Sequence, residues 1–85
     1  MSLVKCEEWW YTPRLDDKGR GILWVNPEYV MMASEAVMGA DSARDTYYGI
    51  HMRNDLGMPV TDFYLKNTPQ GNDAFDKISG RTGGP

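Results

Sequence analysis

The sequence predicts a small α+β domain in which one central helix covers one face of an antiparallel sheet. Two observations lead to this prediction. Residues 26–39 combine helix-boundary residues with apolar side chains at helical spacing, and pairs of short β-forming stretches lie before and after them. Two hairpins on either side of one helix give the element order ββαββ. The expected domain covers residues 1–66, and residues 67–85 form an irregular, polar C-terminal arm that contains Gly and Pro.

The first hairpin is expected over residues 3–25. β-forming side chains are frequent in residues 3–12, and Pro, Asp and Gly residues predict a turn over residues 13–21. Residues 22–25 are apolar on both faces, as in a central strand that is covered on both sides.

Two adjacent tryptophans, Trp9 and Trp10, stand on the first expected strand, so their indoles must point to opposite faces of the sheet. One indole is expected in the core. The other is expected to anchor a protein partner, because tryptophan is enriched at the energetic centres of interfaces. The alternative is that this second indole lies flat on the sheet, covered by the polar tail.

The central helix is expected to begin with Asn26 as its cap and Pro27 in its first turn, and to end near Gly39. An apolar arc that includes Val30 and Val37 would face the sheet. Met31 and Met38 fall on the opposite side of the helical wheel. They are interpreted either as isolated surface methionines or as an adaptable contact with another chain.

The second hairpin is expected over residues 46–66. Polar and apolar side chains alternate over residues 46–53, the stretch 54–59 has turn residues, and residues 60–66 alternate again. A helix over residues 41–53 is the alternative, because some apolar residues there share a helical face. A strand is preferred, since Gly49 weakens a helix and the tyrosines favour a sheet.

The C-terminal arm is expected to dock onto another chain. Phe75 and Ile78 are its only sizeable apolar side chains, and one helical turn over residues 73–78 would place them together. Two side chains cannot offset the entropy cost of ordering the whole arm, so neighbouring protein surface would have to contribute. Deletion of residues 68–85 is therefore expected to spare the fold and weaken assembly.

Composition and spacing exclude several classes of function. The net charge is −3 without a basic cluster, which disfavours nucleic-acid binding. One cysteine and one histidine allow no internal disulfide and make a structural zinc site unexpected. No apolar run reaches the ~20 residues of a membrane span, and the N-terminus does not resemble a signal peptide. We therefore expect a soluble protein, in a virion or in the cytoplasm, with no membrane partner and no cofactor.

The lone histidine, His51, offers little chemistry by itself. Asp55 or Asp62 could orient it and Cys6 could be imagined as a nucleophile, but nothing in the spacing requires this. No catalytic, cofactor or metal residues are predicted, and the protein is expected not to be an enzyme. The alternative is a small homo-oligomeric enzyme or ligand-binding domain with an inter-subunit pocket near His51 and Arg53.

The predicted function is that of a non-enzymatic interaction or assembly component. Its partners would be other proteins or further copies of the chain. Candidates are a small virion structural protein that decorates or cements a capsid, and an accessory subunit. The predicted partner-binding residues are Trp9, Trp10, Met31, Met38, Phe75 and Ile78.

Overall fold

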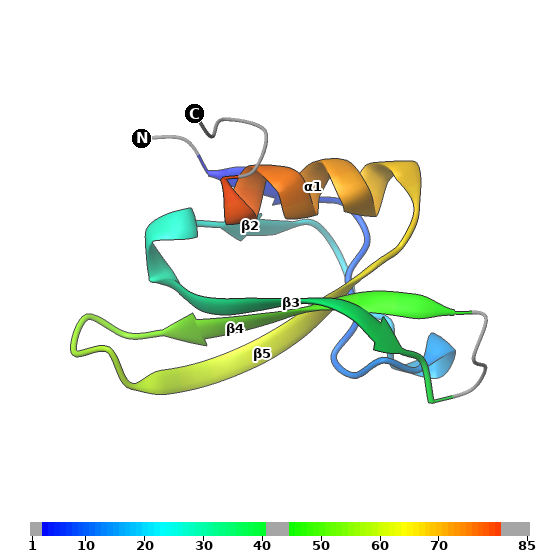
Figure 1. Ribbon diagram of the computed structural model, residues 1–85, viewed down its shortest axis with the longest axis horizontal. Coiled ribbons are helices and arrows are strands. Elements are labelled where there is room, and N and C mark those ends of the chain that lie inside the picture. Colours follow the sequence, from blue (N-terminus) through cyan, green and yellow to red (C-terminus); the bar gives the residue numbers. More distant parts are fainter. Residues whose placement is uncertain (1–2, 41–44, 81–85) are drawn as a thin grey trace.

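The computed structural model describes residues 3–40 and 45–80, except for the side chains of residues 35–37. Within these residues the fold is α+β, with five antiparallel strands in two sheets and a C-terminal helix (Figure 1). The order of strands and α-helix is βββββα, so the predicted order ββαββ is wrong. The elements are β1 (Val4–Cys6), η1 (Leu15–Asp17), β2 (Leu23–Val25), η2 (Pro27–Tyr29), β3 (Val30–Met38), β4 (Thr46–Arg53), β5 (Pro59–Lys66) and α1 (Pro69–Ser79).

The predicted central helix is replaced by a 3-10 turn and the longest strand. Asn26 does cap the turn η2, because its side chain accepts a hydrogen bond from the Glu28 amide at 3.1 Å. The chain then continues as β3, which carries two register shifts against β4, between Val30 and Met32 and between Ser34 and Val37. At each shift an extra residue enters one strand. Residues three apart can therefore share a face, which imitates the spacing of a helix.

The prediction of an irregular C-terminal arm is wrong for residues 69–79, which form the helix α1. Thr68 caps it by accepting from the Gly71 amide at 3.1 Å, Pro69 stands in its first turn, and Gly80 ends it in the left-handed conformation with φ 76°. The helix buries one face against its own chain. Its buried residues are Gly71, Ala74, Phe75 and Ile78. The expected docking residues Phe75 and Ile78 are thus core residues, while residues 81–85 lie outside the described residues.

Close packing at the start of α1 explains why a glycine stands at position 71. A Cβ atom on Gly71 would lie 1.8 Å from the carbonyl oxygen of Lys66. The helix therefore approaches the end of β5 at a distance that only glycine allows. This approach brings the apolar face of α1 onto β1 and β5.

The second predicted hairpin is confirmed. β4 occupies residues 46–53 as predicted, so the helical alternative for this stretch is wrong, and β5 begins one residue earlier than expected, at Pro59. The register pairs Ile50 with Phe63 and Gly49 with Tyr64. The connection over residues 41–44 lies outside the described part of the chain.

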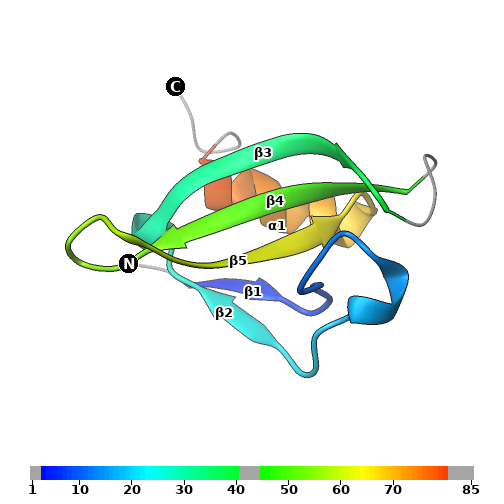
Figure 2. The same cartoon turned by 90° about the horizontal axis from the view of Figure 1, so that it is seen from below.

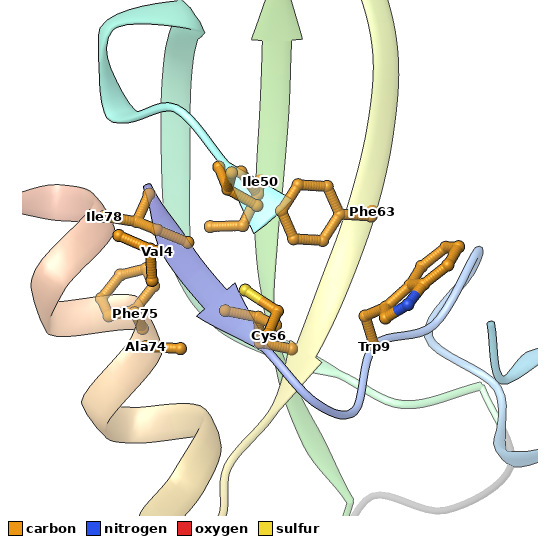
Figure 3. Close-up of a cluster of buried hydrophobic side chains, with 10 residues drawn as sticks. Val4, Cys6, Trp9, Ile50, Phe63, Ala74, Phe75 and Ile78 are labelled. Atoms are coloured by element: carbon orange, nitrogen blue, oxygen red, sulfur yellow. The ribbon is translucent and has the colours of Figure 1, made fainter. Parts of the chain in front are cut away.

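The core lies between the three-stranded sheet and a layer made of α1, β1 and β2. Figure 2 shows the β3–β4–β5 sheet from its outer side, with α1 behind it. Inward-facing side chains of β4 and β5 meet side chains from β1 and α1 in one cluster (Figure 3). The buried residues of this cluster are Val4, Cys6, Trp9, Val25, Ile50, Phe63, Leu65, Ala74, Phe75 and Ile78.

The first hairpin is shorter than predicted and is divided between the two sheets. β1 pairs with β2 over three residues only. After a bend, Trp10 pairs with Tyr64 of β5, and the two residues exchange backbone hydrogen bonds of 2.8 Å. Trp10 therefore joins the edge of β5 through one isolated bridge. None of the helices in the described ranges is long and apolar enough to cross a bilayer.

Candidate docking surface

The six predicted partner-binding residues divide into two groups. Met31 and Met38 are 46% and 62% exposed. The other four side chains are at least nine-tenths buried within the chain itself: Trp9, Trp10, Phe75 and Ile78. A partner could reach these four only after local opening of the fold. A role for any of the six in binding stays a prediction.

Both N-terminal tryptophans are covered by the loop that follows them. The Trp9 indole donates from Nε1 to the Gly21 carbonyl at 3.1 Å and lies against Gly19, where an added Cβ would come within 2.4 Å of the ring. The Trp10 indole packs edge-on against Tyr47, with ring centroids 5.7 Å apart. Lys18 Nζ lies 5.8 Å from the Trp10 ring centroid. Trp10 is therefore buried and does not lie flat on the surface; residues 81–85 of the tail lie outside the described residues.

The tryptophan that does reach the surface is Trp24. Among the described strands, β2 pairs with β1 only. Trp24 within β2 is 56% exposed, and Ile22, which precedes the strand, is 50% exposed. The sequence suggested a central strand covered on both faces, because all four residues of 22–25 are apolar. β2 is an edge strand because of its position in a two-stranded sheet. A run of four apolar residues does not encode that position.

The β4–β5 hairpin carries Leu56, the most exposed large apolar side chain of the described residues, and two further exposed apolar side chains. Leu56 is 85% exposed, and Met58 and Val60 are each 58% exposed. We call these three side chains the hairpin tip. In both Figure 1 and Figure 2 the β4–β5 turn projects beyond α1 and beyond the β1–β2 pair. The sequence predicted a turn over residues 54–59 and did not single out its apolar side chains.

Hydrogen bonds hold the backbone of this turn in one conformation. Asn54 Oδ1 accepts from the amides of Leu56 and Met58 at 2.9 and 3.0 Å, and the Asn54 amide donates to the Met58 carbonyl at 2.9 Å. Gly57 adopts φ 79°, a left-handed conformation that favours glycine. The turn is therefore ordered by its backbone and by Asn54, without burial of its apolar side chains.

A second set of contacts braces the hairpin against η2. The Tyr29 hydroxyl donates to Asp55 Oδ1 at 2.5 Å, and this hydrogen bond raises the pKa of Tyr29 above its usual value, with the charge of Asp55 acting in the same direction. Arg53 donates from Nη2 to the Glu28 carbonyl at 2.5 Å, and its guanidinium lies 5.4 Å from the Tyr29 ring centroid. The base of the hairpin is thus tied to the segment that precedes β3.

The residues proposed for an alternative ligand pocket do not converge within the chain. His51 Nδ1 lies 3.0 Å from Asp62 Oδ1 on the outer face of the sheet, while the Arg53 guanidinium donates to the carbonyls of Asn54 and Glu28. Neither residue lines the cleft of about 220 Å³ found between α1 and the β1 region. Of the two carboxylates considered for orienting His51, the nearby one is Asp62.

That cleft is rimmed by charged residues that pair within the chain. Lys5 lies 3.4 Å from Glu7, Lys77 lies 3.0 Å from Asp73, and Glu8 pairs with a lysine outside the cleft. Cys6 also lines the cleft but is only 1% exposed, and burial raises the pKa of its thiol to about 11. A thiol with this pKa is protonated at neutral pH and is a poor nucleophile.

Neither a metal-binding group nor a similar known protein indicates what these surfaces bind. Among the described side chains, which leave out residues 35–37 and 41–44, no group of three or more His, Cys, Asp or Glu residues is placed to hold a metal ion. Comparison with protein-family models, curated proteins and solved structures gives no match. A function for this chain must therefore be argued from the geometry of its own surfaces.

Proposed function

We propose that this protein is a non-enzymatic interaction module that docks onto another protein through the hairpin tip. The observation that carries the proposal is the combination of high apolar exposure with a hydrogen-bonded turn. Leu56, Met58 and Val60 do not stabilise the turn by burial, so their exposure has no evident structural purpose in the isolated chain.

A preordered apolar turn is well suited to binding. Full burial of one such aliphatic side chain contributes about 1.5–3 kcal/mol. A loop that becomes ordered only on binding loses conformational entropy, which reduces affinity. Here the hydrogen bonds to Asn54 and the contact between Tyr29 and Asp55 order the turn before association, so this loss is smaller. Because the tip projects from the body, the matching partner surface is a concave apolar pocket.

Trp24 provides a second exposed anchor on a different element. Tryptophan is among the residues most enriched at the energetic centres of interfaces. Its 56% exposure on the edge strand β2 supports a role in association. The narrower forms of the proposal, a capsid decoration or cement protein and an accessory subunit, stay predictions.

Site-specific photo-crosslinking tests the proposal. A photoreactive amino acid replaces Leu56 in one sample and Asp16 in a matched control, since Asp16 is exposed but lies in η1, far from the β4–β5 turn in Figure 1. After irradiation in an extract of the source cells, position 56 is expected to give a discrete protein adduct that position 16 does not give. An adduct of two copies of the chain would identify the partner as a second copy.

Competition makes the result specific to the apolar tip. An excess of the unlabelled native chain should remove the adduct, and an excess of the Leu56→Asp variant should not. Identical adducts from positions 16 and 56, or equal competition by both unlabelled chains, would overturn the proposal. Unchanged circular dichroism of Leu56→Asp confirms that the variant is folded.

A further inference from the structure

A serine and the histidine are diagonal neighbours on the outer face of the β3–β4–β5 sheet. One row across the sheet holds Ser34 and Gly49, and the row two residues further along β4 holds His51 and Asp62. Ile50 lies between the two rows and is buried in the core. Because side chains alternate between the two faces of a sheet, both rows point outward. An aromatic side chain can span the distance between such diagonal neighbours.

The space above Gly49 is where these two side chains approach each other. A Cβ atom on Gly49 would lie 3.5 Å from His51 Nε2 and 3.7 Å from Ser34 Cβ. The imidazole therefore extends along β4 toward the row of Ser34. The Ser34 hydroxyl is one bond beyond Cβ, so rotation about χ1 can turn it toward Nε2. The Tyr64 ring borders the same point, with its Cε2 atom at 3.3 Å.

The imidazole of His51 is held in the tautomer that a general base requires. Asp62 Oδ1 lies 3.0 Å from Nδ1, which favours a proton on Nδ1 and leaves the lone pair on Nε2. The side chains of His51 and Asp62 are 24% and 50% exposed, and Ser34 is half-buried, so a small reagent can reach them from solvent. Carboxylate, imidazole and hydroxyl in this order are the groups that activate a serine as a nucleophile.

From this arrangement we infer that Ser34 is a covalent modification site that accepts an acyl group from a small acyl thioester. His51 Nε2 takes the hydroxyl proton as Ser34 Oγ attacks the thioester carbonyl carbon. The bond between that carbon and sulfur then breaks, and the thiolate leaving group takes the proton from Nε2. The products are an O-acyl serine and a free thiol, with no oxidation or reduction. Asp62 is a positioning residue, since it holds the imidazole in the required tautomer.

Charge favours a neutral acyl group over a phosphoryl group at this site. Phosphoryl transfer relies on cationic groups that stabilise the transferring phosphate. The charged group beside His51 is instead the carboxylate of Asp62, and the guanidinium of Arg53 donates to backbone carbonyls near η2. The modification needs no turnover and is independent of the proposed docking function, because neither Leu56 nor Trp24 takes part in it.

Treatment of the full chain with phenyl thioacetate tests the site. Intact-mass spectrometry follows acetylation, and peptide mapping locates it. Ser34 is expected to be acetylated faster than Ser79, an exposed serine on α1 whose hydroxyl donates to the Asp76 carbonyl at 3.3 Å. Both serines meet the same reagent in the same sample, so the ratio of their rates reports the activation of Ser34. Equal rates would overturn the inference.

Variants of the two supporting residues test their roles. His51→Gln should lower the acetylation rate at Ser34 by about 100-fold or more, the usual contribution of a general base, and leave Ser79 unchanged. Asp62→Asn should lower the rate at Ser34 by more than about tenfold, because the preferred tautomer is lost. In Asp62→Asn the nitrogen NMR shifts of the imidazole should report that loss, which a general loss of stability would not produce. Circular dichroism checks that each variant is folded.

Ser34→Ala separates the serine from other nucleophiles of the chain. This variant keeps His51 and Asp62 and should lose the fast acetylation. The Cys6 thiol should stay free, because it is 1% exposed and burial raises its pKa to about 11. Fast acetylation that persists in Ser34→Ala, at Cys6 or elsewhere, would overturn the inference. A native rate at Ser34 in folded His51→Gln would overturn it as well.

Discussion

The N-terminal segment over residues 4–21 and the β4–β5 hairpin both carry large apolar side chains in or next to a loop. The N-terminal segment folds back so that Trp9 and Trp10 are 9% and 6% exposed. The hairpin holds Leu56 outward at 85% exposure. Two loops of the same small protein therefore place their apolar side chains in opposite environments.

Backbone hydrogen bonds close both loops, and the difference lies in what side-chain packing adds. In the N-terminal segment the Gly19 amide donates to the Trp9 carbonyl at 2.7 Å, and the indole of Trp9 also packs against Gly19. In the hairpin, Asn54 and the backbone close the turn, and no apolar burial is required. Loss of an apolar side chain should therefore damage the fold in the first region and only the surface in the second.

The largest effect is expected from Trp9→Ala. Removal of a buried tryptophan costs about 3–5 kcal/mol of unfolding free energy, through lost burial and an unfilled cavity. Trp24→Ala is the matched control, with an expected loss of about 1 kcal/mol or less, since Trp24 is 56% exposed and makes cross-strand contacts only on one side. Denaturant titration measures both, and equal losses would contradict the contrast between buried and exposed tryptophans.

Alkaline pH should destabilise the N-terminal segment through Cys6. Folding raises the pKa of the thiol from 9.0 to about 11, so between these values the unfolded state loses a proton that the folded state keeps. Stability is therefore unaffected below pH ~9 and falls by about 2–3 kcal/mol as pH rises to about 11. The slope of unfolding free energy against pH, compared with that of Cys6→Ala, isolates the thiol. Parallel slopes would argue against the shift.

Two glycine substitutions separate packing from backbone strain. Gly19→Ala places a Cβ 2.4 Å from the buried Trp9 ring, and such overpacking costs about 1–3 kcal/mol. Gly57→Ala meets nothing within 4 Å, but its φ of 79° costs about 1–2 kcal/mol for a residue with a side chain. Thermal unfolding of Gly57→Asn should recover part of that loss, since asparagine tolerates this conformation. No recovery would mean that φ is not the cause.

The smallest change is expected at the hairpin tip. Leu56→Ala should alter the unfolding free energy by about 0.5 kcal/mol or less, because an exposed side chain loses little on truncation. Leu65→Ala, at a leucine that is 0% exposed, should cost about 2–5 kcal/mol in the same chemical denaturation experiment. A large loss for Leu56→Ala would mean that the tip packs against the chain and is not free to dock.

The second hairpin could be predicted from local sequence patterns. Regular alternation over residues 46–53 and 60–66 identifies strands whose two faces have different environments, and Asn54 and Gly57 supply the turn between them. Signals for α1 were also present, with Thr68 and Pro69 at one end and Gly80 at the other. Two large apolar residues between them gave too weak a pattern to indicate the helix.

The conformation of residues 26–39 and the burial of the tryptophans depend on tertiary contacts. Two register shifts in β3 produce spacings of three that a sequence pattern cannot distinguish from a helical face, and the pairing with β4 selects the strand. Adjacent tryptophans must leave a strand on opposite sides. Whether the second side is solvent or protein depends on where the loop over residues 13–21 lies. The exposure of Leu56 follows the same rule, since it arises from the place of the β4–β5 turn at the end of its hairpin, which no local pattern encodes.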